Sequence, residues 1–198
     1  MMIDLLNRFN FILASKSPRR QHLLSEIGLK FSVRAENVQE SYPPELLREE
    51  IPLYLSRQKS EAFNTNLLDN NTILITADTI VWIDKTNVGK PSTADEAIAS
   101  LRLLSGRMHE VITGVCLRTA NRTHSFYACS EVWFKPLLQD EIDYYVHHCK
   151  PYDKAGAYGI QEWIGYIGIE RINGSFYNVM GLPVQQLYDE LLHFCELR

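Results

Sequence analysis

Apolar residues along the chain form two kinds of pattern, short continuous runs and runs with a helical repeat. Continuous runs bounded by turn residues are typical of buried strands, and they predict strands over 9–15, 31–35, 72–84, 108–118 and 123–134. The helical repeat predicts helices over 18–27, from 52 towards 67, and over 93–104, 139–148 and 183–195. A glycine-punctuated stretch after residue 148 is interpreted as a further β segment.

Two of the predicted helices carry start signals. Ser17 is placed to cap the first one, Pro18 suits its first helical position, and Gly28 is a plausible end. Thr93 or Ser92 caps a later helix in the same way. Because short strand–helix units alternate with strand pairs that look antiparallel, we expect an α/β fold with a mixed sheet.

Composition and charge narrow the function classes. The chain has 198 residues, 45% of them hydrophobic, and shows no repeat, linker or low-complexity tract. A net charge of −4 argues against broad binding to nucleic acid, and the apolar runs are too short for a membrane span or a signal peptide, so a cytoplasmic location is expected. The four cysteines form no CxxC pair and the six histidines no metal-binding spacing, which predicts reduced thiols and no zinc site.

The stretch ILASKSPRRQHLL places Arg19 and Arg20 at the start of the first long helix. A helix N-terminus already carries a partial positive charge and unpaired N–H groups, so two cations there add repulsion. One explanation is an exposed helix start whose arginines pair with nearby acids such as Glu26. The other is an oligophosphate bound by the helix N-terminus, the two arginines and the hydroxyl of Ser15.

Three further features are candidates for chemistry. Asp78 lies in the apolar run TILITADTIVWID, where a carboxylate must be either structurally paired or held for catalysis. Lys90 in VGKPS lacks the residues of a Walker motif and on its own is read as an exposed turn lysine. The glycines of GAYGIQ, 156–161, indicate either close backbone approach to a ligand or a β-bulge.

Taken together, the motifs resemble one family from end to end, the Maf proteins, which are nucleoside triphosphate pyrophosphatases. The matching pieces are LASKSPRR (13–20), ADT (77–79), GKP (89–91), LSGRMHEVITGV (104–115), DKAGAYGIQ (153–161) and GSFYNVMGLP (174–183). The resemblance implies a single Maf-like domain over 1–198 with two lobes around a central cleft. It also implies an elongated, twisted mixed sheet with flanking helices, similar to inosine triphosphate pyrophosphatases.

The activity that the resemblance implies is hydrolysis of a nucleoside triphosphate between the α and β phosphates. The products are the monophosphate and pyrophosphate, the cofactor is a divalent cation such as Mg²⁺ or Mn²⁺, and the enzyme is cytoplasmic and often a homodimer. By the same resemblance, Asp78 is the general base, with Glu40 as a second acid that could join it in holding the metal. The residues implied in phosphate binding are Ser15, Arg19, Arg20, Lys59 and Lys90.

Three positions resemble the subgroup that hydrolyses dTTP and UTP: Arg19 after Ser-Pro, Thr79 after the aspartate, and Gln161 at the end of GAYGIQ. The subgroup for 7-methyl-GTP has SPWR, ADQ and an acid at these positions. An amide can both donate to and accept from a uracil edge, whereas a carboxylate suits a cationic methylated guanine. Glu162 stands where many relatives have glycine, which could alter the rim of the pocket.

A second reading is a nucleotide-binding regulator without turnover, since family members are also linked to inhibition of septum formation. The presence of Asp78, Lys59 and Lys90 favours the enzyme, because a protein that only binds has no need of a buried base.

Overall fold

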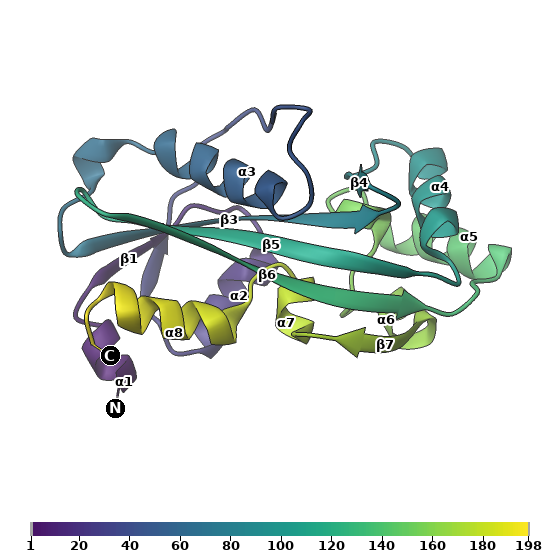
Figure 1. Ribbon diagram of the computed structural model, residues 1–198. Helices are drawn as coiled ribbons and strands as arrows, with labels where there is room; N and C mark the ends of the chain where they lie inside the picture. The colour runs from purple at the N-terminus through teal and green to yellow at the C-terminus, as the bar shows by residue number, and fades with distance from the viewer. Residues whose placement is uncertain (1, 198) are drawn as a thin grey trace. The chain divides into compact units, whose positions relative to one another are not determined.

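The computed structural model describes residues 2–197 and has the mixed α/β architecture that the sequence predicts (Figure 1). The strands form one sheet in the order β2-β1-β3-β5-β6-β7, with β4 paired to β3. Their bounds are β1 Asn10–Leu13, β2 Phe31–Val33, β3 Thr72–Ile83, β4 Thr86–Val88, β5 Met108–Arg118, β6 Thr123–Phe134 and β7 Ile169–Asn173.

The helices flank these strands in sequence and in space (Figure 1). They are α1 Met2–Leu6, α2 Pro18–Glu26, α3 Glu50–Glu61, α4 Ala94–Leu104, α5 Gln139–Cys149, α6 Trp163–Gly168, α7 Phe176–Val179 and α8 Val184–Phe194, with 3-10 turns at Thr65–Leu67 and Ala155–Ala157. Over residues 2–197, none of the helices combines the length and the apolar character that crossing a bilayer requires.

The chain divides into two compact units. Unit 1 consists of Met1–Asp78, Thr113–Ala128 and Gly181–Arg198, and unit 2 of Thr79–Ile112 and Cys129–Met180. The strands β3, β5 and β6 each contribute residues to both units.

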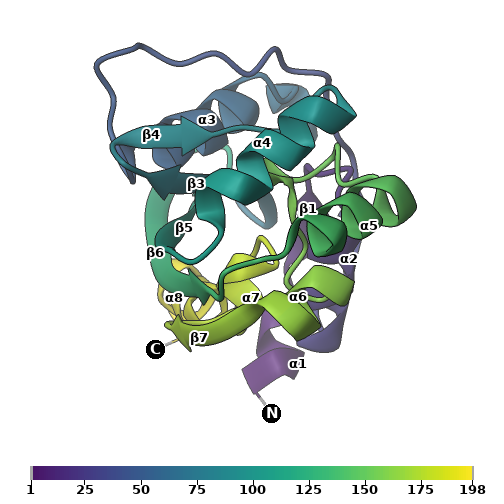
Figure 2. The ribbon, with the colours of Figure 1, turned by 90° about the vertical axis from the view of Figure 1, so that its right-hand side faces the viewer.

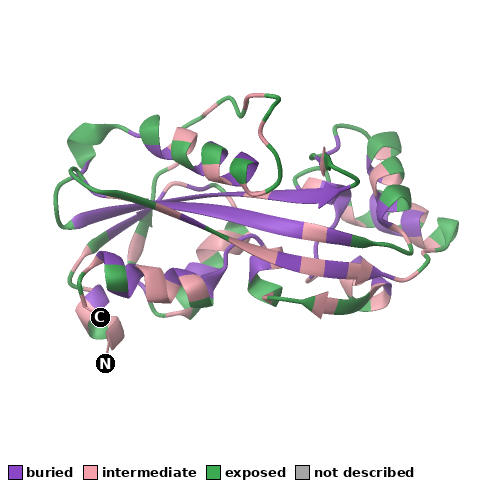
Figure 3. Cartoon of the chain, viewed as in Figure 1, coloured by how far each residue is buried: buried purple, intermediate pink, exposed green. Residues whose placement is uncertain are grey.

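In unit 1, β1 pairs in parallel with both β2 and β3. Helix α3 lies on one face of these strands, and α2 and α8 lie on the other (Figure 1). Buried residues are concentrated in the strands (Figure 3), and every residue of β3 except Thr79 is buried. A strand that is covered on both faces has apolar residues at nearly every position, whereas a half-buried strand has them at alternate positions. A charged residue such as Asp78 is therefore conspicuous in the sequence of β3.

The start of α2 confirms the predicted cap. The Ser17 hydroxyl accepts a hydrogen bond from the Arg20 backbone N–H, and Pro18 occupies the first helical position. Gly28 follows the helix with a φ of +80°, a conformation that glycine adopts without steric cost. Thr93 caps α4 by accepting from the Glu96 N–H.

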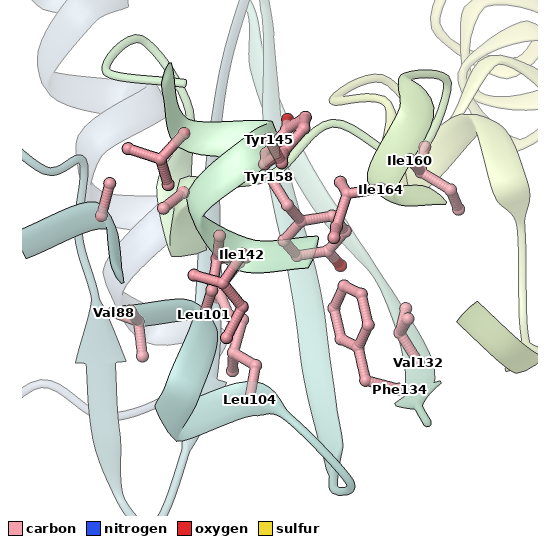
Figure 4. Close-up of a cluster of buried hydrophobic side chains, with 14 of the residues drawn as sticks. Val88, Leu101, Leu104, Val132, Phe134, Ile142, Tyr145, Tyr158, Ile160 and Ile164 are labelled. Atoms are coloured by element: carbon pink, nitrogen blue, oxygen red, sulfur yellow. The ribbon is translucent and has the colours of Figure 1, made fainter. Parts of the chain in front are cut away.

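Unit 2 has its own core, built where α4, α5 and α6 pack on the ends of the long strands (Figure 2). Figure 4 shows its centre, in which side chains from the strands meet those of α4 and α5. The labelled residues are Val88, Leu101, Leu104, Val132, Phe134, Ile142, Tyr145, Tyr158, Ile160 and Ile164. The outer strands of this unit are antiparallel, β4 to β3 and β7 to β6.

The segment after residue 148 differs from the β segment that the sequence predicted. A 3-10 turn and then α6 precede its one strand, β7. Gly156 and Ala157 have φ values of +67° and +59°, so the backbone turns where an extended strand was expected. Glycines within α6 hid that helix from sequence analysis, because glycine is unfavourable in a helix interior.

Smaller differences concern the ends of elements. Helix α3 begins at Glu50, two residues before Pro52, and ends at Glu61, six residues before Leu67. Proline is tolerated in the first turn of a helix, where its missing N–H has no intrahelical partner, so Pro52 did not mark the start. The short elements α1 and β4 were not predicted.

His109 on β5 is a buried histidine of unit 2, 1% exposed. Its Nε2 lies 2.8 Å from the hydroxyl of Tyr158, and its ring stacks on Phe134 at 5.6 Å between centroids. Burial lowers the pKa of His109 from 6.5 to about 3, because the apolar surroundings disfavour the charged ring. The ring is therefore neutral in the folded protein at neutral pH.

This burial makes stability depend on pH. In the unfolded chain His109 binds a proton below about pH 6.5, whereas in the folded chain it does so only near pH 3, so acidification favours unfolding. Replacing His109 with glutamine should remove up to about 1.4 kcal/mol per pH unit from the slope of unfolding free energy against pH between about pH 4 and 6. Urea denaturation at several pH values measures this slope, and equal slopes for the two proteins would contradict the prediction.

Candidate functional site

The N-terminus of α2 is organised by serine side chains. Ser15 lies directly beyond β1, is 7% exposed, and its hydroxyl accepts a hydrogen bond from the Ser17 N–H at 3.2 Å. Gln21 donates from its amide to the Ser15 carbonyl at 3.3 Å. The loop from β1 into α2 is thus held in the strand–turn–helix form that the sequence predicted for a phosphate site.

Arg20 is bound to the backbone of two distant segments. Its Nε donates to the carbonyl of Gly181 and its Nη1 to the carbonyl of Ala77, each at 2.8 Å. Ala77 is the residue before Asp78 on β3, and Gly181 precedes α8. Partial burial of the guanidinium lowers the pKa of Arg20 through desolvation, and the charge of Asp78 opposes this shift. The guanidinium therefore joins α2 to the backbone next to the candidate base.

Asp78 and Glu40 share one lysine. The Nζ of Lys59, in the last turn of α3, lies 2.5 Å from Oδ1 of Asp78 and 2.8 Å from Oε1 of Glu40. The Asp78 side chain is only 8% exposed, whereas that of Glu40 is 41% exposed. Removing a charge from water is costly unless a partner compensates, so the contact with Lys59 offsets the cost of burying the Asp78 carboxylate.

Close packing of α3 brings Lys59 to this position. A Cβ on Gly114 would lie 2.4 Å from the backbone carbon of Pro52, so the glycine lets the first turn of α3 approach β5. Further along the helix, the hydroxyl of Thr76 donates to the carbonyl of Ser56 at 2.7 Å. These contacts fix the distance from the helix to β3 and hence the reach of Lys59.

The C-terminal end of α3 is held as well. Nη1 of Arg118 on β5 donates to the carbonyl of Ser60 at 2.7 Å. Carbonyls at a helix C-terminus lack intrahelical partners, and a cation there is favourable. Because Ser60 follows Lys59, this bond fixes the backbone that carries the lysine.

A metal site in this cluster would need ligands from outside the protein. No group of three or more His, Cys, Asp or Glu side chains within residues 2–197 is arranged to hold a metal. Mg²⁺ is commonly bound by one or two carboxylates together with substrate phosphates and water, and Asp78 with Glu40 provides such a pair. The donor set therefore fits a cation that arrives with a phosphorylated substrate.

The other predicted site residues belong to unit 2. Thr79 is partly buried and directly follows Asp78 in β3, and Lys90 is exposed just beyond β4. The Gly156 N–H donates to the Gly89 carbonyl at 3.2 Å, which joins the turn that carries Lys90 to the segment that ends in Gln161. An arrangement of these residues around the same nucleotide as Lys59 and Arg20 stays a prediction.

The side-chain amide of Gln161 is a candidate contact for a ligand. Its Oε1 is buried and has no hydrogen-bond partner within the described chain. A buried acceptor without a partner costs roughly 1–3 kcal/mol, so this oxygen is suited to receive a hydrogen bond from a ligand.

The sequence did not predict a second buried charge, Lys154, which contacts the residue after Gln161. Lys154, whose side chain is 9% exposed, contacts Glu162 Oε1 at 3.0 Å and Asp153 Oδ1 at 2.6 Å. Lys154 stands between Asp153 and the apolar stretch AGAYGI, so no local pattern in the sequence marks it for burial.

Comparisons with known proteins agree with the resemblance seen in the sequence. Residues 10–194 match the family model described as Maf, Maf-like protein. A dTTP/UTP pyrophosphatase of Parabacteroides distasonis is 53% identical, with 98% of this chain and 100% of the relative covered. Proteins of the same name from Porphyromonas gingivalis (98% and 99% covered) and Bacteroides thetaiotaomicron (96% and 98%) are each 52% identical.

Among solved structures, the Ham1 protein of Staphylococcus aureus is similar with a TM-score of 0.47 and 14% identity, over 63% of this chain and 71% of that one.

The contacts of Arg20 predict its effect on stability. The helix dipole alone would make Arg20→Ala neutral or slightly stabilising, because a cation leaves a helix N-terminus. The structure adds two carbonyls that lose their donor, so we expect a loss of about 1–3 kcal/mol in unfolding free energy. Urea denaturation of the variant and of the parent protein measures this loss. A variant as stable as the parent would contradict the role of Arg20 in joining these segments.

Proposed function

The chain belongs to the Maf family, and we propose from this that it is a nucleoside triphosphate pyrophosphatase that hydrolyses dTTP and UTP to the monophosphate and pyrophosphate. The observation that carries the proposal is the buried Asp78 carboxylate held on Lys59 beside a helix N-terminus suited to phosphate. The names of relatives at about half identity over nearly full length support the activity and the substrates.

In this proposal Asp78 is the general base. Lys59 contacts Oδ1, which leaves Oδ2 outside the ion pair and able to accept a proton from water. The water oxygen attacks the α phosphorus, the bond from that phosphorus to the bridging oxygen breaks, and pyrophosphate leaves. The hydrogen bond from Arg20 to the Ala77 carbonyl supports the mechanism by fixing the backbone beside the base.

Cations stabilise the charge that gathers on the pyrophosphate. We assign this role to the side chains of Arg19, Arg20, Lys59 and Lys90, with the N–H groups and Ser15 hydroxyl at the start of α2. Asp78 and Glu40 would hold a divalent cation, Mg²⁺ or Mn²⁺, together with the phosphates. When bound, such a cation neutralises phosphate charge and lowers the pKa of bound water.

Base recognition falls to unit 2 residues in this proposal. The buried Oε1 of Gln161 suits the imide N–H that uracil and thymine share, and Thr79 is the second specificity residue. A 7-methyl-GTP pyrophosphatase is disfavoured, because an amide stands where an acid would suit the cationic base. A regulator of septum formation without turnover is also disfavoured, since the relatives are named as enzymes. We expect a cytoplasmic homodimer.

The reaction itself is the first test. Incubation with dTTP or UTP and Mg²⁺ or Mn²⁺ should release the monophosphate and pyrophosphate, because attack at the α phosphorus makes pyrophosphate the leaving group. Ion-exchange chromatography resolves the products. Release of a diphosphate and orthophosphate would overturn the bond assignment, and preference for 7-methyl-GTP would overturn the substrate.

The second test concerns the base. Asp78→Asn keeps the shape of the side chain but removes its charge, and Lys59 keeps Glu40 as a partner. A general base contributes about 10²–10⁴-fold, so kcat should fall by at least about 100-fold, while nucleotide binding measured by calorimetry persists. Glu40→Gln, which removes the more exposed carboxylate of the pair, is the comparison. Turnover of a folded Asp78→Asn variant within a few-fold of the parent would remove Asp78 from the mechanism.

A further inference from the structure

Glu162 follows Gln161 and occupies the N-cap position before α6, yet its side chain makes no capping hydrogen bond. Its Oε1 contacts Nζ of Lys154 at 3.0 Å, and its Oε2 accepts a hydrogen bond from the hydroxyl of Tyr145 on α5. The same hydroxyl accepts from the Gly159 N–H at 3.0 Å. Both oxygens of Glu162 are thus used to connect its own turn to α5 and to Lys154.

The partners of Glu162 are buried and rigid. Tyr145 is 0% exposed, and burial together with the Glu162 carboxylate raises the pKa of its hydroxyl, which therefore stays a proton donor. The Nζ of Lys154 also contacts a more exposed carboxylate, that of Asp153. A connected network of this kind fixes its members in one arrangement.

The network encloses the turn that carries Gln161. The Glu162 N–H donates to the Gly159 carbonyl at 3.0 Å, which closes the turn over residues 159–162. A Cβ on Gly159 would lie 2.8 Å from Cδ of Glu162, so the glycine makes room for the carboxylate. Gln161 lies between these two fixed residues, and its buried Oε1 has no partner within residues 2–197.

We propose that Glu162 is a positioning residue that, with Tyr145 and Lys154, holds Gln161 so that its amide oxygen faces the N3–H of a uracil or thymine base. The inference rests on the proposed function. The network fixes the backbone on both sides of Gln161, so the buried Oε1 of its amide is presented from one position in the turn. Cytosine has an acceptor at N3, which repels an amide oxygen at that position, so we expect the network to favour UTP over CTP.

The experiment compares kcat and KM for UTP, dTTP and CTP in the parent, Glu162→Ala and Glu162→Gln. Loss of one well-placed hydrogen bond corresponds to roughly fivefold in affinity, so KM for UTP and dTTP should rise at least that much while kcat changes little. The ratio of kcat/KM for UTP to that for CTP should fall by a similar factor. Tyr145→Phe should do the same, and the double variant should add little, because both act through one network.

Glu141→Gln is the matched control. Glu141 lies at the other end of the unit 2 helix α5 and likewise accepts from a lysine, Lys135 at 2.7 Å, and from a backbone N–H, that of Leu138. The Glu141→Gln variant should have a lower melting temperature but an unchanged KM and an unchanged preference for UTP. If Glu162→Ala does not fold, Glu162→Gln, which keeps the carbon skeleton, carries the comparison.

The outcomes separate this inference from the proposed function. A parent enzyme that hydrolyses UTP, with Glu162 variants that are less stable but unchanged in KM and in preference, would reduce Glu162 to a structural residue and overturn the inference alone. A parent that hydrolyses neither UTP nor dTTP would overturn the proposed function. Raised KM and weakened discrimination in the Glu162 variants, and not in Glu141→Gln, would support the positioning role.

Discussion

The ion pair between Lys59 and Asp78 is the interaction on which the rest of unit 1 depends. A carboxylate inside a strand covered on both faces is tolerable only with a countercharge at contact distance, and Lys59 supplies it from α3. The helix must then lie close to the sheet, which requires a residue without a side chain on the facing strand. Gly114 meets this requirement, so a glycine 36 residues away in sequence sets the position of the charge beside Asp78.

Arg20 also stabilises the backbone beside Asp78, by donating hydrogen bonds to two carbonyl groups. The backbone carbonyls of Ala77 and Gly181 would otherwise lack these donors, and the arginine satisfies both while its charge lies near the carboxylate. The residue that looked misplaced at a helix N-terminus is therefore favourable once tertiary contacts are included. The role of its neighbour Arg19 in substrate binding stays a prediction.

Much of the fold followed from local signals. The boundaries of β5 and β6, the Ser17 cap and the buried position of Asp78 were all predictable, because strand periodicity, capping and a charge in an apolar run are visible within a few residues. The contacts of Arg20 were not predictable, because its partners Ala77 and Gly181 are 57 and 161 positions away in the sequence. Helix α6 was missed because its glycines contradict helix propensity. A Cβ on Gly165 would lie 1.9 Å from the Ile160 carbonyl oxygen, so tertiary packing decides there.

The charges of the cluster explain why it is suited to a substrate that brings cations with it. Arg20 and Lys59 together cancel Asp78 and Glu40, so these four side chains have almost no net charge to offer a triphosphate of about −4. Binding must then either take Lys59 away from a carboxylate or add positive charge. A divalent cation held by the carboxylates would do both, because it would replace Lys59 as their partner and leave the lysine for phosphate oxygens. Through the ion pair of Lys59 with Asp78, phosphate binding and metal binding would then favour each other.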